Sequence, residues 1–538
     1  MKHFLLIGAA LLCLASGYAQ GQADLLITNG RILDGTGNSW FYGDVAIKEG
    51  KILKVGKLAG MKAVKTIDAT GLVVAPGFID VHTHIEGDEW QNPTANNFIL
   101  NGVTTVVTGN CGASNVDIAK YLWQIDSLKP SVNVATLVGH NGVRRAVMGN
   151  ANRPPTPEEQ QRMEALVGAA MKGGAVGLST GLIYIPGTYA RTEEIVGLAK
   201  VAKQYGGLYA SHMRYEGDSV LYAIDEALTI GREARIPVQI SHFKVSGQQN
   251  WGRSRETVAK VARARREGIE VTIDQYPYTA SSTSLSTMLP SELLADGPDS
   301  IKARLQRPEV QRYVVAELLK SLKKRKLKHF SYAVVASHRA DSTYNGKSIE
   351  EINLMKGRKH KAKEEARTVI DLQLAGGAGM VFHGMGEEDV QYIMKYPFNM
   401  FASDASIRIW NQGVPHPRGY GTNARVLARY VREEGVLTLE EAVRRMTSLP
   451  AQKFGLTDRG LLREGYAADV VIFSEAEVKD LSTFERPHAY STGFRYVVVN
   501  GQVVVADEKH LGTRSGKALY GAGASKEPGP AAPPSKPL

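Results

Sequence analysis

The stretch Gly77-Phe78-Ile79-Asp80-Val81-His82-Thr83-His84 decides the interpretation of the chain, because an apolar segment ends there in two histidines one residue apart. In an extended strand, residues i and i+2 point to the same face, so His82 and His84 project together at the carboxyl end of the strand. Two neutral imidazoles that converge on one point form one arm of a metal site. A pair of core or surface histidines is the alternative, and the rest of the chain has to decide between them.

The first residues predict a secretory signal peptide over residues 1–19. A basic start, Met1-Lys2-His3, precedes an apolar run from Phe4 to Ala15, and Gly17-Tyr18-Ala19 places small residues where a signal peptidase cuts. The apolar run is too short to span a bilayer, and no later run is long enough for a transmembrane helix. The sequence therefore predicts an exported protein, periplasmic or secreted, without a membrane span.

The mature chain keeps one of its two cysteines, Cys111, because Cys13 leaves with the signal peptide. An exported chain with one cysteine forms no internal disulfide, and a free thiol is a liability in an oxidising compartment. Simple burial of the thiol is one explanation. However, Cys111 ends the strand-like run from Thr104, with glycines at 109 and 112 that allow close approach. A thiolate held by a metal would be both functional and protected.

The formal net charge of +11 gives little information about partners. The lysines and arginines are spread over helix-like segments or gathered at residues 323–328, a run that is typical of a solvated helix face. No aromatic interleaving or nucleic-acid-binding module accompanies this run, so we expect no nucleic acid partner.

Between residues 77 and 448, apolar runs alternate with helical stretches, which predicts a parallel βα array. Eight of these runs are candidate strands, the number that closes a (β/α)8 barrel of the TIM type. The gap between the seventh and the eighth is too long for one helix, so we expect an inserted subdomain at about 281–376, near the barrel mouth. The candidate strands are Phe78–His84, Thr104–Cys111, Val132–His140, Ala175–Leu182, Leu208–Met213, Val238–Phe243, Val271–Tyr276 and Met400–Ser406.

Short alternating strands flank this array at both ends of the chain, at 24–68 and again beyond residue 465, where Asn500-Gly501 is a hairpin signal. We expect both ends to build one small composite β-sandwich module beside the barrel. The tail is rich in Gly, Ala, Pro, Ser and Lys, which predicts disorder. The predicted domains are the signal peptide (1–19), the two parts of the β module (20–75 and 456–520), the barrel (76–455) and the tail (521–538).

Three further ligand-type residues end later candidate strands: His212 the fifth, His242 the sixth and Asp404 the eighth. The carboxyl ends of barrel strands share one face, where barrel enzymes build their active sites. We therefore expect one site there. Nitrogen, sulfur and carboxylate ligands of this mixture suit zinc. The full predicted ligand set is His82, His84, Cys111, His212, His242 and Asp404.

These residues resemble the pattern of the amidohydrolase superfamily, which has His-x-His on strand one, histidines on strands five and six, and aspartate on strand eight. Within it, the chain is similar to the D-aminoacylase (N-acyl-D-amino-acid deacylase) family from about residue 23 to residue 520. The sharpest marker is Gly109-Asn110-Cys111-Gly112. The other matching stretches are 76–84, 139–144, 179–187, 241–244 with 250–252, 416–418 with 421–422, and 458–469.

The resemblance implies a metal-dependent hydrolase barrel that uses zinc to cleave the amide bond of N-acyl-D-amino acids, with D-dipeptides as further candidate substrates. Many superfamily members bridge two metals with a carboxylated lysine on the fourth strand, but residues 175–182 contain no lysine. The family replaces that lysine with a thiolate, which Cys111 resembles. The resemblance then implies one tightly bound zinc on Cys111, His212 and His242, and a weaker second site on His82, His84 and Asp404.

Catalysis needs a group that moves a proton and groups that hold the substrate. Asp404 is the predicted proton acceptor for the attacking water and donor to the leaving amine. Lys244 follows His242 on the same strand face and is the first candidate for the substrate α-carboxylate, with Tyr184 similar to an assisting tyrosine of the family. Arg339 and Arg408 are further candidates. For all four substrate-binding candidates, an ordinary surface or structural role is the alternative.

Two positions depart from the family pattern: Glu86 stands where aspartate is usual, and Ile183 stands where an acidic residue is common. Both leave the side-chain and acyl preference open. A cyclic-amide hydrolase of the dihydroorotase or hydantoinase kind remains an alternative, although the missing fourth-strand lysine argues against it. A catalytically inactive barrel kept for binding is a second alternative. The sequence leaves the oligomeric state undetermined.

Overall fold

The computed structural model describes residues 22–525. The predicted signal peptide and the last part of the predicted tail lie outside this range. Gly521 and Ser525 donate backbone hydrogen bonds to the carbonyl oxygens of Gly174 and Lys172, so the ordered chain continues past the predicted start of the tail. Among residues 22–525, no helix combines the length and the apolar character needed to cross a bilayer.

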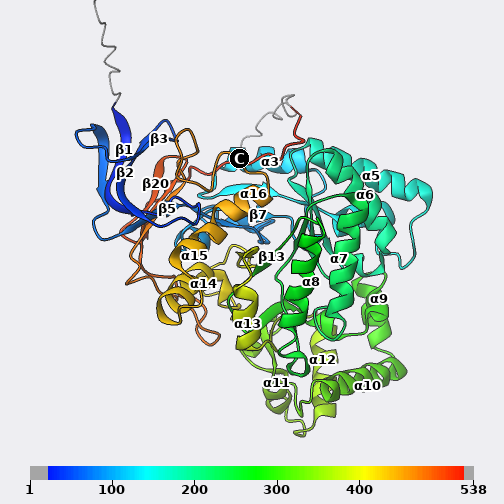
Figure 1. Ribbon diagram of the computed structural model, residues 1–538. Helices are drawn as coiled ribbons and strands as arrows, with labels where there is room; N and C mark the ends of the chain where they lie inside the picture. Colours follow the sequence, from blue (N-terminus) through cyan, green and yellow to red (C-terminus); the bar gives the residue numbers. More distant parts are fainter. Residues whose placement is uncertain (1–21, 526–538) are drawn as a thin grey trace, which may run out of the picture.

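Parallel strands, among them β7 and β13, lie at the centre of the molecule with helices beside them (Figure 1). Their pairing makes a ring. The third predicted strand is divided into β8 and β9 at Leu137, whose N–H still bonds to the carbonyl of Thr108 on the second strand. The ring is closed by a β-bridge between Thr83, which follows the first strand, and Ala405, which follows the last strand. The barrel strands are β6 (Phe78–Asp80), β7 (Val103–Thr108), β8 (Asn133–Thr136), β9 (Val138–Gly139), β10 (Gly177–Gly181), β11 (Leu208–His212), β12 (Val238–Ile240), β13 (Val271–Gln275) and β17 (Asn399–Phe401).

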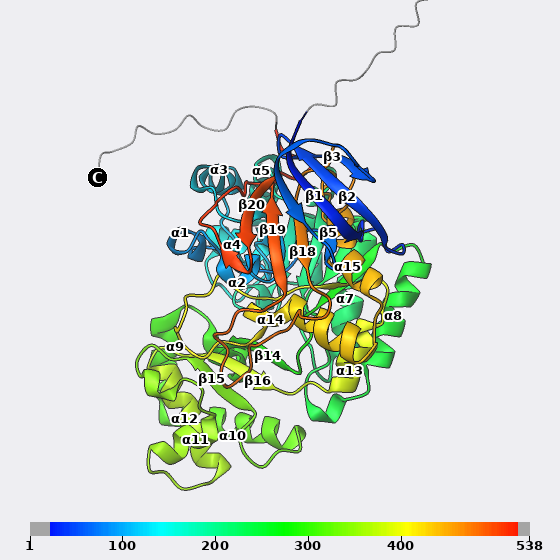
Figure 2. The same cartoon turned by 90° about the vertical axis from the view of Figure 1, so that its left-hand side faces the viewer.

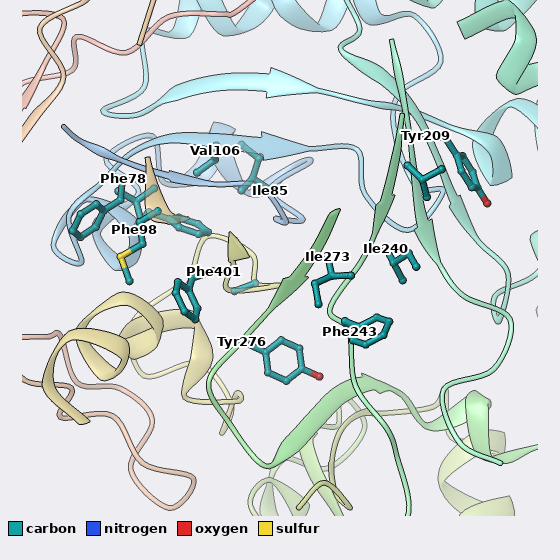
Figure 3. Close-up of a cluster of buried hydrophobic side chains, with 14 of the residues drawn as sticks. Phe78, Ile85, Phe98, Val106, Tyr209, Ile240, Phe243, Ile273, Tyr276 and Phe401 are labelled. Atoms are coloured by element: carbon teal, nitrogen blue, oxygen red, sulfur yellow. The ribbon is translucent and has the colours of Figure 1, made fainter. Parts of the chain in front are cut away.

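The barrel strands are buried on both faces, as is usual where helices cover a parallel sheet. Successive residues of a strand point to opposite faces. Accordingly, Phe78 and Val106 pack in the cluster that includes the surrounding helices, whereas their neighbours Ile79 and Val107 belong to a separate cluster on the other face. Figure 3 shows Phe78, Val106 and other members of the first cluster along neighbouring strands.

Helices follow the strands along the chain and cover the ring. Their ends carry ordinary local signals: α5 begins with a capping box between Thr156 and Glu159 and has Pro157 in its first turn. The helices are α1 (Asp88–Gln91), α2 (Asn96–Ile99), α3 (Ile118–Leu128), α4 (His140–Met148), α5 (Pro157–Lys172), α6 (Thr192–Gln204), α7 (Val220–Ala234), α8 (Ser254–Arg266), α13 (Glu387–Met394), α14 (Arg418–Arg425), the π-helix η6 (Val426–Glu433), α15 (Leu439–Met446) and α16 (Ser448–Lys453), with short 3-10 turns η1 (Gly187–Tyr189) and η2 (Gln248–Asn250).

An inserted subdomain separates β13 from β17 and has a hydrophobic core of its own. Antiparallel pairing of Ala280 with His383 extends it beyond the predicted range of 281–376 at both ends. Figure 2 shows its helices gathered on one side of the barrel. Its elements are β14 (Ala280–Ser284), η3 (Leu285–Met288), η4 (Ser291–Leu294), α9 (Pro298–Leu305), α10 (Pro308–Lys324), β15 (Ala333–Ser337), η5 (Ser342–Tyr344), α11 (Ile349–Met355), α12 (Ala362–Leu374) and β16 (Gly379–His383).

The composite β module joins both ends of the chain in one nine-stranded sheet (Figure 2). The two parts meet where β5 pairs with β18, with Val73 opposite Phe473. Buried side chains from both parts share one cluster, which includes Ile27, Val74 and Val470. The strands are β1 (Ala23–Ile32), β2 (Phe41–Lys48), β3 (Lys51–Gly56), β4 (Ala63–Asp68), β5 (Val73–Pro76), β18 (Val470–Phe473), β19 (Phe494–Val499), β20 (Gln502–Ala506) and β21 (Lys509–His510).

Candidate metal centre and active site

The six predicted ligand residues come together at the carboxyl ends of the barrel strands. Only His212 ends a strand; the other five lie in the loops just beyond their strands. The prediction that the histidine pair belongs to the first strand is therefore wrong, since β6 ends at Asp80. His82 and His84 still face a common partner, because the bridge at Thr83 keeps the chain beside the eighth strand.

Three of these residues, Cys111, His242 and Asp404, adopt left-handed backbone conformations, with φ values of 53°, 35° and 51°. For residues other than glycine such conformations cost about 1–3 kcal/mol each, and they persist where the surroundings hold them. The backbone N–H of His242 donates to Asp274 Oδ1 at 2.7 Å, and that of Asp404 donates to the carbonyl of His82 at 2.8 Å. The turns thus redirect the chain at the residues whose side chains meet.

Glycines beside Cys111 allow this loop to lie close to the next strands. A Cβ atom on Gly112 would lie 2.2 Å from Asn141 Oδ1, and one on Gly109 would lie 2.2 Å from the carbonyl oxygen of Leu137. Both glycines also have positive φ values, of 76° and 75°. The close approach inferred from the sequence is therefore required by the structure.

The thiol of Cys111 lies among three histidines. Its Sγ atom is 3.3 Å from His82 Nε2, 3.4 Å from His212 Nδ1 and 3.7 Å from His242 Nε2, and the last two nitrogens are 2.7 Å apart. Ligand bonds of about 2.0–2.3 Å in a tetrahedron separate the donor atoms by roughly 3.3–3.8 Å. Most of the observed separations match that range, so these donors fit a shared cation.

A second set of donors adjoins the first. Asp404 Oδ1 is 3.1 Å from His84 Nε2 and 3.5 Å from His82 Nε2. His82 thus lies between the thiol and this carboxylate. Because the two sets overlap, the donor atoms fit one ion or two adjacent ions.

The electrostatics at Cys111 and His212 favour the protonation states that metal ligands need. Burial raises the pKa of Cys111, but His82 and His212 lower it well below its ordinary value, which favours a thiolate. Burial and the neighbouring His242 lower the pKa of His212, which favours a neutral imidazole. Thiolate and neutral imidazole are the forms that bind metals, so Cys111 and His212 fit a metal chemically as well as geometrically. At the other histidines the anionic neighbours act in the opposite direction. Burial lowers the pKa values of His82 and His84, but Cys111 and Asp404 raise the pKa of His82 well above its ordinary value, and the hydrogen bond to Asp404 raises the pKa of His84 to about 9.

Two carboxylates behind the histidines were not anticipated from the sequence. Asp274 Oδ1 is 3.4 Å from His82 Nδ1, and Glu216 Oε1 is 3.0 Å from His242 Nδ1. Asp274 thus favours a proton on His82 Nδ1 and leaves Nε2 free for a metal. His242 Nδ1 lies between Glu216 and the Lys244 ammonium, whose Nζ is 2.8 Å away, so both groups orient the ring. The sequence feature that could have indicated such a role was Asp274 itself, because it is a carboxylate inside the apolar seventh strand.

Pockets connect the site with the inserted subdomain. A pocket of about 290 Å³ opens on His84 and Cys111, and a larger one of about 1070 Å³ extends between the barrel rim and the insertion. The two share the lining residues Arg145, Tyr184 and Ile185. They form a route of suitable size for a small-molecule substrate.

The predicted substrate-binding residues are placed differently from one another. Tyr184 lies in the site: its ring centroid is 4.8 Å from that of His212, and its hydroxyl is 2.9 Å from Thr283 Oγ1 of the insertion. Lys244 is buried beside His242, with Nζ 2.5 Å from Glu216 Oε1. Arg339 lines only the larger pocket, and Arg408 lines neither of the two.

Arg418 is a further cation in the site, and the sequence reasoning assigned it no role. Its guanidinium is buried, 2.8 Å from Asp404 Oδ2 and 4.5 Å from the ring centroid of Tyr276. Burial raises the pKa of Asp404, but Arg418 and His82 lower it well below its ordinary value, so Asp404 is a carboxylate. The sequence feature that could have indicated a role for Arg418 is the His416-Pro417-Arg418 motif, which matches the family pattern.

The two positions that depart from the family pattern have different surroundings. The carboxylate of Glu86 accepts hydrogen bonds from Thr108 Oγ1 at 2.7 Å and from the Gly109 N–H at 2.5 Å, so it holds the start of the Cys111 loop. Ile183 lines the larger pocket. Ile183 is therefore the one of the two that a substrate side chain can reach.

Residues 65–505 match the amidohydrolase family, and the chain therefore belongs to that family. It is 36% identical over 514 residues to N-acyl-D-glutamate deacylase of Alcaligenes xylosoxydans xylosoxydans, covering 90% of this chain and 94% of the relative. It is also 36% identical over 521 residues to D-aminoacylase of the same organism, covering 92% and 97%. Within the amidohydrolases, the chain is thus a member of the D-aminoacylase group, which confirms the resemblance inferred from its motifs.

A solved structure supports the same placement. The crystal structure of N-acyl-D-glutamate deacylase from Bordetella bronchiseptica contains zinc and a phosphonate inhibitor that mimics the tetrahedral intermediate. It matches this fold with a TM-score of 0.79 and 36% identity, covering 93% of this chain and 100% of the solved chain. The predicted barrel with its accessory β module is confirmed as the fold of this group.

Proposed function

We propose that the protein is a zinc-dependent hydrolase that cleaves the amide bond of N-acyl-D-amino acids and releases a carboxylate and a free D-amino acid. The observation that carries this proposal is the convergence of Cys111, His212 and His242 on one point, with Asp404 beside them, at the end of a pocket. Two relatives, each 36% identical to this chain over at least 90% of its length, are named for the removal of acyl groups from D-amino acids.

In this proposal one zinc is tightly bound by Cys111, His212 and His242, and a second, partly occupied site is formed by His82, His84 and Asp404. The close donor atoms of the first set and the contacts of Asp404 with both histidines support it. Zinc lowers the pKa of a water molecule toward about 7 and polarises the carbonyl of an amide. The residues around it have other tasks. Glu216 and Asp274 orient His242 and His82, as carboxylates behind histidine ligands commonly do.

Asp404 is the group that moves the proton. It is a carboxylate beside both histidines of the second site, so a water bound there would lie next to it. It accepts the proton of that water through a carboxylate oxygen. It then returns the proton to the nitrogen of the leaving amine, the usual sequence in general acid–base catalysis of amide cleavage.

The α-carboxylate of the substrate needs a cationic partner, and the geometry ranks the candidates. Lys244 is already paired with Glu216, whereas Arg418 uses part of its guanidinium for Asp404 and stacks on Tyr276. A guanidinium has five N–H donors, so Arg418 keeps donors for a second carboxylate. Neither Arg418 nor Lys244 lines the two pockets, so the ranking depends on the remaining donors, and Arg418 precedes Lys244 as the proposed anchor. Tyr184 assists it from the pocket wall.

Replacement of Arg418 by methionine is expected to lower kcat/KM by roughly 10- to 200-fold for every D substrate, because a hydrogen bond to a charged group is worth about 1.5–3 kcal/mol. Steady-state kinetics on several side chains measure this. An Arg418→Lys variant should recover part of the loss, since it restores the charge. A much larger effect in Lys244→Met, with zinc content unchanged, would make Lys244 the anchor instead.

A substrate panel tests the proposed activity directly. Purified protein, incubated with N-acetyl-D- and N-acetyl-L-amino acids and with D-dipeptides, is expected to release ninhydrin-reactive amine from the D compounds. Dihydroorotate and hydantoins serve as cyclic-amide controls. Equal turnover of L substrates would contradict the D-specific assignment, and turnover of the cyclic amides alone would favour the alternative activity.

The remaining alternatives lack a supporting feature in the site. The fourth barrel strand, β10, carries no lysine that could be carboxylated. All six donor residues are present and close together, which disfavours a barrel kept only for binding.

We also propose that the protein is exported. Support comes from the sequence of residues 1–19, and cleavage there would leave Gln20 as the first residue of the mature chain. Intact-mass measurement of the protein from its native host detects this end directly, and an uncut chain would contradict the proposal.

A further inference from the structure

A second group of histidine and glutamate side chains lies in the inserted subdomain, on α11, on α12 and in the loops beside them (Figure 1). His329 Nδ1 is 2.6 Å from Glu365 Oε1, and His360 Nε2 is 2.5 Å from Glu350 Oε1. His329 Nδ1 is also 3.7 Å from the same Glu350 oxygen. One donor atom from each residue thus lies within 4.8 Å of the other three.

The cluster combines a buried charge with an accessible side. Glu365 has 0% of its side chain exposed, and its second oxygen accepts the backbone N–H of Phe330 at 2.8 Å. His360 has 52% of its side chain exposed, so an ion can reach the cluster from solvent. A buried carboxylate is costly unless a positive charge compensates it, and here two carboxylates lie side by side.

The neighbouring cations Arg358 and Lys356 do not supply the positive charge that these two carboxylates need. Arg358 and Lys356 both pair with Asp371, at 2.6 and 2.7 Å. The imidazole rings of His329 and His360 are stacked, with centroids 4.2 Å apart and planes 21° apart. Two positively charged rings would repel each other at that distance. A divalent cation held by all four side chains would compensate both carboxylates without adding charge to the stacked rings.

We propose that His329, Glu350, His360 and Glu365 bind a divalent transition-metal ion, zinc in the first instance, at a structural site separate from the catalytic centre. Two imidazoles and two carboxylates make a closed tetrahedral donor set of the kind zinc accepts, whereas calcium and magnesium take oxygen ligands. The four donor atoms lie within 4.8 Å of one another, and the edge of such a tetrahedron is about 3.3 Å. Two His–Glu separations, 2.5 and 2.6 Å, are hydrogen-bond distances, and a bound ion would take the place of the shared protons.

The ion would connect four positions of the insertion that are spread from residue 329 to residue 365. His329 precedes β15, Glu350 lies in the first turn of α11, and Glu365 lies near the start of α12, while His360 occupies the loop between the two helices. A ligand that binds only the folded state stabilises it by mass action. The proposed metal therefore stabilises the subdomain that forms one wall of the larger pocket, without taking part in the hydrolysis.

The experiment uses the full chain with the Cys111→Ala substitution, which removes the tight zinc site of the barrel. In this background, His360→Ala is compared with the parent and with Lys363→Ala, an exposed neighbour on α12 that belongs to neither site. Each protein is equilibrated with zinc, and its zinc content and thermal unfolding are measured. His360→Ala should hold one zinc fewer per chain than the other two and should lose the rise in Tm that zinc gives them.

A second cluster variant and a second metal ion test whether the effect comes from a folding defect and whether the site selects zinc. Glu350→Gln has nearly the same shape as the parent side chain and should lose the same zinc, so a folding defect in one variant cannot produce the result by itself. Calcium in place of zinc should give no rise in Tm. Equal zinc content and an equal Tm rise in the parent and in both cluster variants would overturn the proposal and leave the cluster as an ion-pair network, and an equal effect of calcium would overturn the metal class.

Discussion

Replacement of Asp404 by asparagine is expected to lower turnover by about 100-fold or more. The amide keeps the size of the carboxylate, but it cannot accept the proton of the attacking water, and positioned acid–base groups typically contribute 10²–10⁴-fold. The hydrogen-bond partner His84 and the cation Arg418 lie on opposite oxygens of Asp404, so the substitution also removes charge that both groups face. Steady-state kinetics on an N-acetyl-D-amino acid measure the loss.

Zinc content and KM separate the loss of the proton acceptor from a collapse of the site. The tight site on Cys111, His212 and His242 does not include Asp404, so Asp404→Asn should retain about one zinc per chain and a KM close to that of the parent. Turnover near that of the parent would show that another group handles the proton. Loss of all zinc would show that Asp404 holds the tight ion.

Replacement of Cys111 by alanine is expected to remove the tightly bound zinc and, with it, measurable activity. Even residues that only orient a metal ligand contribute about 10- to 100-fold to affinity, so removal of a ligand itself should cost at least 100-fold. Elemental analysis after dialysis and the amine-release assay check both effects. The thiolate has three histidine neighbours within 3.7 Å, so its loss changes the centre of the site.

Cys111→Ser is the matched control, because it keeps the size of the side chain and replaces the soft thiolate with a weak oxygen ligand. It should retain more zinc than Cys111→Ala and less than the parent at the same free zinc concentration. Full zinc in Cys111→Ala would remove this residue from the tight site.

The candidate ligands could be predicted from sequence because each lies at the end of an apolar strand or just beyond it. Their common face depends only on parallel strands that end together, which is why residues as distant as His82 and Asp404 could be assigned to one site. Their local conformation could not be predicted. Cys111 and Asp404 have left-handed backbones, which depend on tertiary hydrogen bonds rather than on residue preference.

Other features depend on tertiary contacts that leave a weak trace in the sequence. The strand β14, Ala280-Ser281-Ser282-Thr283-Ser284, has little apolar alternation, so the edges of the insertion extended beyond the predicted ones. Arg418 lies well beyond the eighth strand, and only the folded loop brings it to Asp404. Glu216 likewise reaches His242 from a loop without a recognisable pattern.

The closure of the barrel at Thr83 and Ala405 bears on the order in which the centre is assembled during synthesis. The N–H of Asp404 bonds to His82 and the N–H of His84 bonds to Ala405, so this closing contact runs through the second set of donors. Cys111, His212 and His242 all leave the ribosome long before residue 405. The proposed ligands of the tight zinc are thus complete on the nascent chain before its ring of strands can close, whereas the proposed catalytic aspartate arrives only with the last strand.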